Sequence, residues 1–342
     1  MYFTLKNSTF KILKIFGIFR LFRYLNKHKI PVLCYHGVSI EDEHEFMPSN
    51  YMTFKTFKSR IHFLKKSGYR IISLQDSLNM IKNKKIEKNC VVLTIDDGFT
   101  AIFDELIPFL NENNIPITAY ITSYKSKFEI PIFRLLAQYL YWKSKKNKIS
   151  LDDLDIETKT GSPVEFKEIK TEEDLWEFIK LCEVSCMRKQ RQEALSFLAK
   201  KFGVELTPDI IKAHSIANLK TLKDFAKCET LDIQLHTHTH KTKMKIDSFK
   251  KDIQKNIDYL REVVSYPLEH FCYPSGQWNE EMIPVLKELN IKSATTCDPG
   301  LMDTDTNPYK IPRIIDSESM NELVFYSEIS GVSSWLRKLF NK

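Results

Sequence analysis

Short apolar runs alternate with helical patterns along most of this chain. Residues 30–36 form an apolar run that ends in polar residues, and residues 53–67 carry apolar side chains at helical spacing before Gly68. The first pattern is typical of a buried parallel strand, and the second of an amphipathic helix closed by a glycine. The same alternation predicts strands at residues 69–73, 90–95, 116–121, 231–235, 270–273 and 293–296, and helices at 74–82, 101–113, 248–265 and 280–289. Repeated strand–helix units predict an α/β fold with a parallel, barrel-like sheet.

The alternation stops between residues 126 and 217. Within this stretch a helix-capping signal starts at Thr171, and apolar residues follow it at helical spacing. We therefore predict that residues 29–316 form one barrel domain, interrupted by a helical insertion at 126–217. We expect the insertion to cover or shape the rim of the barrel.

Both ends of the chain have an amphipathic character. Residues 10–23 combine bulky apolar side chains with a cation every few positions, and residues 333–340 follow a similar pattern. No uninterrupted apolar run approaches the roughly 20 residues that span a bilayer, and no signal-peptide cleavage pattern follows. Two interpretations of residues 1–28 stay open, a helix in the interface of an anionic membrane and a helix packed on the barrel. Residues 317–342 form the matching C-terminal tail.

The composition is that of a folded globular protein. Of the 342 residues, 43% are hydrophobic and 28% are charged. The net charge of +7 comes from scattered lysines rather than from a groove interleaved with aromatic residues, so we predict no nucleic-acid partner. Seven cysteines, an odd number spread over a long chain, favour reduced thiols. We therefore expect a cytoplasmic protein, peripheral on the inner membrane face if its ends bind lipid.

Two distant segments carry the candidate chemistry. Residues 94–98 place two adjacent carboxylates after an apolar run, and residues 235–240 contain alternating histidines. Together they supply the His, His and Asp ligands of an open metal site and leave one carboxylate free as a base. Alternating histidines also occur in double-sheet β barrels of the cupin kind. That alternative fails here, because the chain has only 9 glycines and repeated strand–helix units.

Four segments, taken in order, resemble a known family. Residues 30–38, Thr94 to Gly98, His236 to His240 and residues 271–276 are similar to the motifs of polysaccharide deacetylases with the NodB homology domain, carbohydrate esterase family 4. The resemblance covers residues 30–124 and 218–316 and is strongest to the poly-N-acetylglucosamine deacetylase branch. It implies a distorted (β/α) barrel with fewer than eight parallel strands. It also implies a divalent metal, most commonly Zn²⁺, and hydrolysis of an acetyl group on a sugar.

The resemblance assigns roles to particular residues. Asp97, His236 and His240 match the metal ligands, and Asp96 matches the general base. Ser275 falls in the motif whose backbone N–H donates to the oxyanion of the tetrahedral intermediate.

The chain departs from the family pattern in two places. The family's usual arginine beside the third motif is replaced by Cys272, and no histidine follows His270 to act as the late general acid. Arg313, at another predicted strand exit, is our candidate for orienting the base, with an ordinary rim arginine as the alternative. His36 ends the first predicted strand and matches the acid of the poly-N-acetylglucosamine branch. Asp298 is the candidate that orients His36, and a simple turn residue is the alternative.

The resulting hypothesis is a metal-dependent hydrolase that removes the N-acetyl group of an amino sugar in a polysaccharide or glycolipid. Acetate and a free amine would be the products. A sugar deformylase, an O-deacetylase and a barrel that binds glycan without turnover remain as alternatives, because the motif arginine and the late histidine are both missing.

Overall fold

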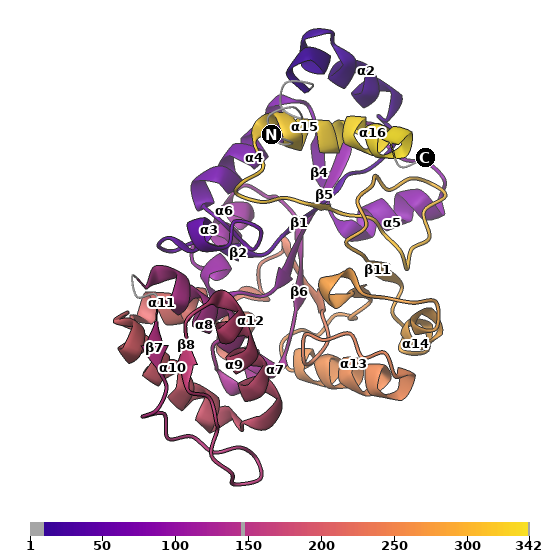
Figure 1. Ribbon diagram of the computed structural model, residues 1–342. Coiled ribbons are helices and arrows are strands. Elements are labelled where there is room, and N and C mark those ends of the chain that lie inside the picture. Colours follow the sequence, from indigo (N-terminus) through magenta and orange to yellow (C-terminus); the bar gives the residue numbers. More distant parts are fainter. Residues whose placement is uncertain (1–9, 145–147, 341–342) are drawn as a thin grey trace.

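The computed structural model of the protein describes residues 10–144 and 148–340, and its centre is a parallel β-sheet (Figure 1). Seven strands follow one another in the order β11, β10, β9, β6, β5, β1, β12, and β4 pairs with β5 outside this path. The strands are β1 (Val32–Tyr35), β4 (Arg70–Ile72), β5 (Cys90–Asp97), β6 (Ile117–Ile121), β9 (Leu231–Leu235), β10 (His270–Cys272), β11 (Ser293–Thr295) and β12 (Ile314–Ile315). All pairs in this sheet are parallel, so the predicted α/β barrel class is confirmed.

Helices connect and cover these strands. They are α2 (Ile18–Leu25), α3 (Glu43–Phe46), α4 (Phe54–Lys66), α5 (Leu74–Lys82), α6 (Leu106–Glu112), α7 (Tyr124–Phe128), α8 (Phe133–Lys143), α9 (Glu172–Ser185), α10 (Arg188–Phe202), α11 (Pro208–Ala213), α12 (Leu219–Phe225), α13 (Ile246–Leu260), α14 (Met282–Glu288), α15 (Glu322–Ser330) and α16 (Val332–Phe340), with 3-10 turns η1 (Thr100–Phe103) and η2 (Pro274–Gly276). The helix predicted at 53–67 is α4, which Thr53 caps by accepting a hydrogen bond from the Thr56 N–H.

The sheet curls so that its two ends approach each other. The chain leading into β12 pairs with β11 through a bridge between Thr295 and Ile311, and β12 itself pairs with β1. Side chains alternate along β5: Val91, Leu93 and Ile95 pack outward under the helices, whereas Cys90 and Val92 fill the interior. The interior is therefore apolar at the start of the strands, and later inward positions are free to carry polar groups.

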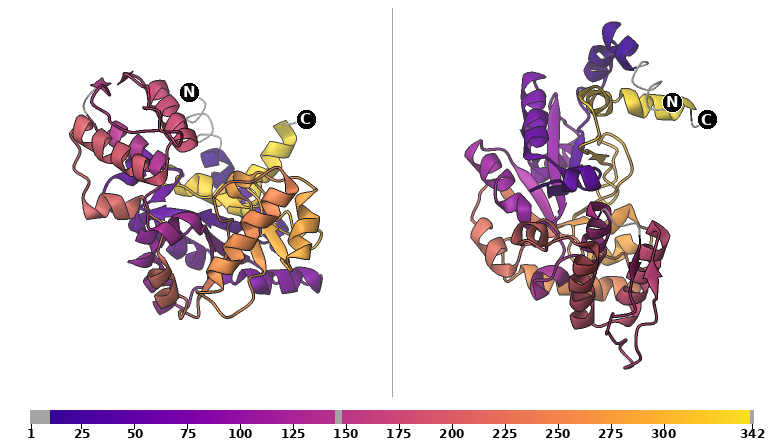
Figure 2. Two further views of the ribbon diagram at one scale, coloured as in Figure 1. Left: turned by 90° about the horizontal axis from the view of Figure 1, so that it is seen from below. Right: turned by 60° about the vertical axis from the view of Figure 1, so that its left-hand side comes forward.

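The insertion has a hydrophobic core of its own. Buried residues of α8, α9 and α10 pack together, with Ile149 and Ile169 from a short antiparallel ribbon of β7 (Ile149–Ser150) and β8 (Glu168–Ile169). The sequence pattern indicated helices in this stretch but not this ribbon, whose two-residue strands are too short to show alternation. Another short pair, β2 (Gly37–Val38) with β3 (Tyr51–Met52), follows β1. Figure 2 (right) shows the insertion and the terminal helices at opposite ends of the molecule.

The two ends of the chain pack side by side. Phe10, Phe19 and Val332 are buried together, and the Phe22 and Trp335 rings lie 5.1 Å apart between α2 and α16. One face of α2 is thus packed on the C-terminal helices, while its other face is exposed (Figure 1). Within the described residues no helix has the length and apolar character needed to cross a bilayer. Residues 1–9 of the predicted N-terminal segment lie outside the described residues.

Candidate active site

The end of β5 delivers two carboxylates to the same place. In a regular strand Asp96 and Asp97 would point to opposite faces of the sheet. Asp97 instead has φ 70°, in the left-handed region, and Gly98 follows with φ 85°. A Cβ at Gly98 would lie 2.6 Å from Ile121 Cδ1, so the turn needs glycine for space as well as for its backbone conformation. This left-handed turn breaks the alternation and places both carboxylates at the carboxyl ends of the strands, where parallel folds carry their chemistry.

The two histidines lie on the loop after β9, and α13 holds this loop in place. Asp252 accepts hydrogen bonds from the backbone N–H groups of His238 and Thr239 and from the Thr239 hydroxyl. Asn256 accepts from the His236 N–H. The loop contains further strained residues, since φ is 63° at residue 237 and 53° at residue 240. Left-handed non-glycine residues are costly and concentrate at functional sites, where surrounding contacts fix them.

Asp97, His236 and His240 converge on one point. Asp97 Oδ1 lies 3.3 Å from His236 Nε2 and 2.8 Å from His240 Nε2. Asp97 Oδ1 is buried. Although both histidine Nε2 atoms lie close to it, it accepts no hydrogen bond with acceptable geometry within the described residues. His236 Nδ1 lies 2.9 Å from the backbone carbonyl of Cys272, which fixes Nδ1 as the donor and leaves the Nε2 lone pair directed at the cluster. Two imidazoles and a carboxylate in this arrangement fit a divalent metal of the zinc type.

Asp96 is held by Arg313, which is fully buried. The guanidinium donates from Nη1 to Oδ1 and from Nη2 to Oδ2, both at 2.7 Å. Ile314 pairs with Leu33 on the outward face, so Arg313 points into the barrel. Burial alone would raise the pKa of Asp96, but the charge and hydrogen bonds of Arg313 outweigh it and hold this pKa well below its usual value. Asp96 is therefore a carboxylate at neutral pH, with both of its oxygens accepting hydrogen bonds from Arg313.

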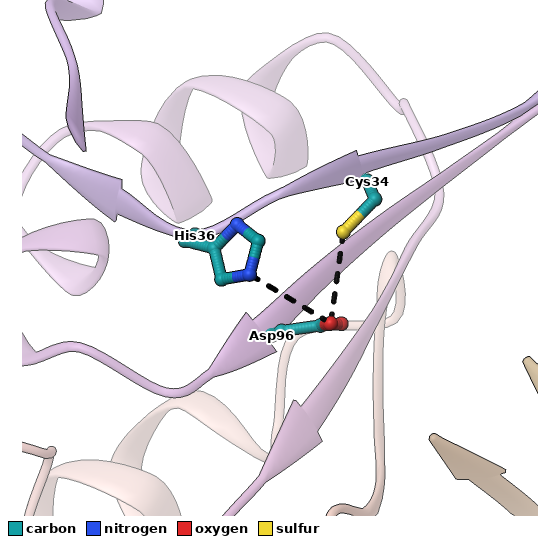
Figure 3. Close-up of side chains that lie close together, drawn as sticks. All are labelled: Cys34, His36 and Asp96. Atoms are coloured by element: carbon teal, nitrogen blue, oxygen red, sulfur yellow. Dashed lines mark hydrogen bonds and ion pairs between the residues drawn. The ribbon is translucent and has the colours of Figure 1, made fainter. Parts of the chain in front are cut away.

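Three more groups surround Asp96: Cys34 from β1, His36 directly after β1, and Cys272 from β10. Cys34 pairs with Thr94 in the sheet, which places His36 beside Asp96 on the inward face. Figure 3 shows the Cys34 and His36 side chains directed at this carboxylate; Oδ2 lies 3.6 Å from Cys34 Sγ and 4.0 Å from His36 Nε2. Cys272 Sγ is 3.3 Å from the same oxygen. Burial lowers the pKa of His36, although Asp96 and Asp97 oppose this, so the free imidazole is neutral.

No hydrogen bond joins Asp298 to His36 within the described residues. Its backbone N–H donates to Thr296 Oγ1, and its carbonyl accepts from the Arg313 N–H. The side chain is exposed, and within the described residues His36 Nδ1 has no hydrogen-bond partner. The role predicted for Asp298 is therefore wrong: the residue forms the turn after β11 that ties this strand to the segment carrying Arg313.

Ser275 lies in the 3-10 turn after β10, with φ 55°. Two contacts join this turn to the histidine loop. The Thr242 hydroxyl donates to the Pro274 carbonyl at 3.2 Å, and the Cys272 carbonyl receives His236 Nδ1. A Cβ at Gly276 would lie 2.6 Å from Cys297 Cβ, so the turn packs tightly against the end of β11. The structure therefore brings the Ser275 loop to the same end of the barrel as the metal-ligand cluster.

Two buried polar residues of α13 support the site and were not predicted from the sequence. Asp252 and Asn256 are buried polar residues one turn apart on α13, a helix that was otherwise assigned by its apolar spacing. Their signal was available, because two polar side chains on the buried side of an amphipathic helix require partners. Cys34 was treated as part of an apolar strand, and its place beside Asp96 follows only from the strand register.

The family model for polysaccharide deacetylases matches residues 83–177 and 185–294, together more than half of the chain. The chain belongs to the polysaccharide deacetylase family. Among curated relatives, a poly-beta-1,6-N-acetyl-D-glucosamine N-deacetylase of Staphylococcus aureus (strain MRSA252) is 25% identical over 144 residues, 36% of this chain and 50% of the relative. The putative polysaccharide deacetylase YxkH of Bacillus subtilis is 28% identical over 94 residues, 27% of this chain and 32% of the relative. The chain thus spans about half or less of these relatives.

Solved structures show the same fold. The Streptococcus pyogenes deacetylase PplD, in complex with acetate, has a TM-score of 0.57 at 16% identity, covering 88% of this chain and 98% of that chain. IcaB from Ammonifex degensii has a TM-score of 0.54 at 12% identity, covering 89% and 96%. The family resemblance inferred from the four motifs is confirmed.

Proposed function

We propose that this protein is a metal-dependent deacetylase that hydrolyses the N-acetyl group of an amino sugar in a polysaccharide or glycolipid. The observation that carries the proposal is the meeting of three candidate metal-ligating side chains with a second carboxylate that lies outside this ligand set. Asp97, His236 and His240 supply the ligand atoms, and Asp96 lies next to them, ionised and held by Arg313. Family membership and the deacetylase names of the relatives agree with this chemistry.

Each group around the site has a task in this reaction. A divalent metal, when bound, polarises the acetyl carbonyl and lowers the pKa of a water molecule. Asp96 accepts the proton of the attacking water, and its fixed position avoids reorganisation during the attack. The Ser275 N–H donates to the oxygen that becomes negatively charged. His36 starts as a neutral imidazole and receives this proton from Asp96, whose Oδ2 lies 4.0 Å from His36 Nε2. The resulting imidazolium gives the proton to the departing amine.

The direct test is acetate release. The metal-loaded protein is incubated with N-acetylglucosamine oligosaccharides, and the masses of the products are measured by mass spectrometry. We expect the loss of one acetyl group per modified sugar, with a free amine in its place. Release of formate from N-formyl sugars instead would assign a deformylase, and acetate release only from O-acetyl sugars would assign an O-deacetylase. Glycan binding with no release from any of these substrates would identify a binding barrel and contradict the proposal.

Arg313 positions the base, and its removal should change the pH profile. Arg313 lowers the pKa of Asp96, so in Arg313→Gln this pKa rises and the acid limb of kcat/KM moves to higher pH. The variant should also lose about 3–5 kcal/mol of stability, because a buried charge pair is broken. The pH profile and the thermal unfolding of the variant are the measurements.

Arg60→Gln is the matched control for Arg313→Gln. Arg60 is also buried and donates to Asp316 at 2.9 Å, but it lies outside the site. It should destabilise the fold similarly and leave the acid limb unchanged. If both variants, or neither, moved the acid limb, Arg313 would have no specific effect on the base.

We also propose that the N-terminal segment contacts an anionic membrane. Ile15 and Phe16 are 81% and 76% exposed, and Lys14 and Arg20 lie close to them in the chain. The exposed Leu339 and Phe340 of α16 add to the apolar surface at this end of the molecule. An amphipathic segment of this kind binds through buried apolar area and attraction to anionic lipids.

Replacing Ile15 and Phe16 together by glutamate should release the protein from vesicles that contain anionic lipid. Each apolar side chain contributes about 1.5–3 kcal/mol when fully buried, so the partition coefficient should fall by tenfold or more. Co-sedimentation measures it. The control replaces the exposed Val184 and Met244 by glutamate, which adds the same charge elsewhere. Equal sedimentation of both double variants with the vesicles would refute the contact.

A further inference from the structure

A basic pocket lies between the histidine loop and the insertion. Its volume is about 210 Å³. Five cations line it, together with a single carboxylate: Lys125, Arg188, Arg191, Lys241, Lys243 and Glu183. The cations come from three separate parts of the chain, namely α7, α10 and the loop after β9. Several distant segments therefore converge to give one wall of the active-site region a strong positive charge.

The basic pocket adjoins the metal-ligand cluster. Thr239 and Lys241, which flank the ligand His240, both line it. Tyr124, another lining residue, donates its backbone N–H to the His238 carbonyl at 2.7 Å, which fixes α7 against the same loop. The charge of Asp97 also acts on Lys125. The cations therefore lie next to the loop at which we place the acetyl group of the substrate.

Within the described residues, the carboxylates near this pocket compensate only part of its positive charge. Glu183 already lies 3.9 Å from Arg134 Nε. Within residues 10–144 and 148–340, none of the five lining cations forms an ion pair. Burial lowers the pKa of Lys125, with Glu183 and Asp97 opposing this effect, so burying its charge carries a cost. Lys125, Arg191 and Lys243 are partly buried, whereas Arg188 and Lys241 are exposed. Several cations that line one pocket without ion-pair partners are typical of a site for an anionic ligand.

The start of α10 points to the same ligand class. Its first turn contains Arg188 and Arg191 and no acidic residue, and the N-cap residue Met187 makes no side-chain cap. Cations here oppose the helix dipole, whereas an anion would interact favourably with the dipole, the free N–H groups and both arginines. Arginine also matches the oxygens of phosphate and carboxylate in a two-pronged geometry, which lysine does not.

We infer that the basic pocket binds an oxyanion on the substrate, a phosphoryl or carboxylate group attached to the N-acetylated glycan, and that the insertion thereby selects acidic glycans over neutral ones. This inference rests on the proposed deacetylase function. The oxyanion lies between Arg188, Arg191 and the lysines of the histidine loop, while the acetyl group lies at the metal-ligand cluster. Phosphate and carboxylate share this chemistry, and the choice of substrates separates them.

Three substrates test the inference with the zinc-loaded protein: an N-acetylglucosamine oligosaccharide, the same oligosaccharide with one phosphate ester, and the same with one uronic acid residue. We expect the KM of at least one acidic substrate to be about tenfold or more below that of the neutral one, as for gain of a charge-assisted hydrogen bond. The acidic substrate with the lower KM identifies the oxyanion as phosphate or carboxylate. Equal KM values for all three substrates would overturn the inference.

Arg191→Gln should raise the KM of the preferred acidic substrate about tenfold and the KM of the neutral substrate by a clearly smaller factor. Lys189→Gln is the matched control, because Lys189 lies in the same turn of α10 but does not line the basic pocket. It removes the same charge and should have little effect. Equal effects of the two variants would mean that only the net charge of the protein matters, and would contradict a specific oxyanion site in the basic pocket.

A binding experiment keeps this inference separate from the proposed function. Calorimetry with zinc-loaded Asp96→Asn measures the affinity for the acidic and the neutral oligosaccharide without turnover. Tighter binding of the acidic one, lost in the double variant with Arg191→Gln, supports the basic pocket even if the wild type releases no acetate. Equal affinities contradict it even if the wild type is an active deacetylase.

Discussion

Asp96→Asn should retain the metal and lose turnover. Asparagine has the same shape as aspartate but cannot accept the proton of the attacking water. Loss of a general base typically lowers kcat by about 10²–10⁴. In the proposed site Asp97, His236 and His240 supply the ligand atoms, so Asp96 lies outside this ligand set. Metal content by mass spectrometry and kcat from acetate release are the two measurements.

The variant also removes the anionic partner of Arg313, so its fold must be checked. Arg313 would keep a hydrogen-bond acceptor in the asparagine oxygen but lose the opposite charge, and some loss of stability is expected. Asp298→Asn is the control, since Asp298 is exposed and directs only backbone groups at its neighbours. It should leave both kcat and metal content unchanged. An Asp96→Asn protein as active as this control would remove the base from the mechanism.

The sheet and the first ligands of the site could be predicted from the sequence because their signals are local. The apolar run of β5 ends at two carboxylates, and strand exits in parallel folds meet at one end of the sheet. The histidine spacing added the remaining ligands. The position of the Asp298 side chain could not be predicted correctly. Asp298 and His36 both follow strands of the same sheet, but this does not tell which way either side chain points. That depends on hydrogen bonds such as the one from the Arg313 N–H to the Asp298 carbonyl.

The conformation of the loops that carry the site residues could not be predicted from the sequence. Asp97, Thr237, His240 and Ser275 all have positive φ, and none of them is glycine. Intrinsic preference argues against each of these conformations. They persist because α13 and the tight turns at Gly98 and Gly276 fix the backbone, and those contacts join residues far apart in sequence. The loops that carry the site residues are thus strained, and the contacts of α13 and of the two glycine turns hold them in place.

Loss of a metal ligand should have the largest effect of all. In His240→Ala the cluster keeps one imidazole and one carboxylate, which is too few for a stable zinc site. We expect the metal to be lost on dialysis and acetate release to fall by at least about a thousandfold, since a metal contributes several kcal/mol to transition-state stabilisation. Asp97→Ala and His236→Ala should behave alike. His236 is buried, so its variant should also be less stable than the His240 variant.

His238→Ala is the matched control, because it removes an imidazole from the same loop without touching the cluster. The His238 ring points to Ser123, with Nδ1 2.9 Å from Oγ, and packs against Tyr124. This variant should keep its metal. Thermal unfolding gives a readout besides activity: zinc at 100 times its dissociation constant stabilises a folded site by about 2.7 kcal/mol. Zinc should therefore raise the melting temperature of the wild type and of His238→Ala but not of His240→Ala. A zinc-dependent shift that survived in His240→Ala would place the metal elsewhere, and the assignment of Asp96 as the free base would fail with it.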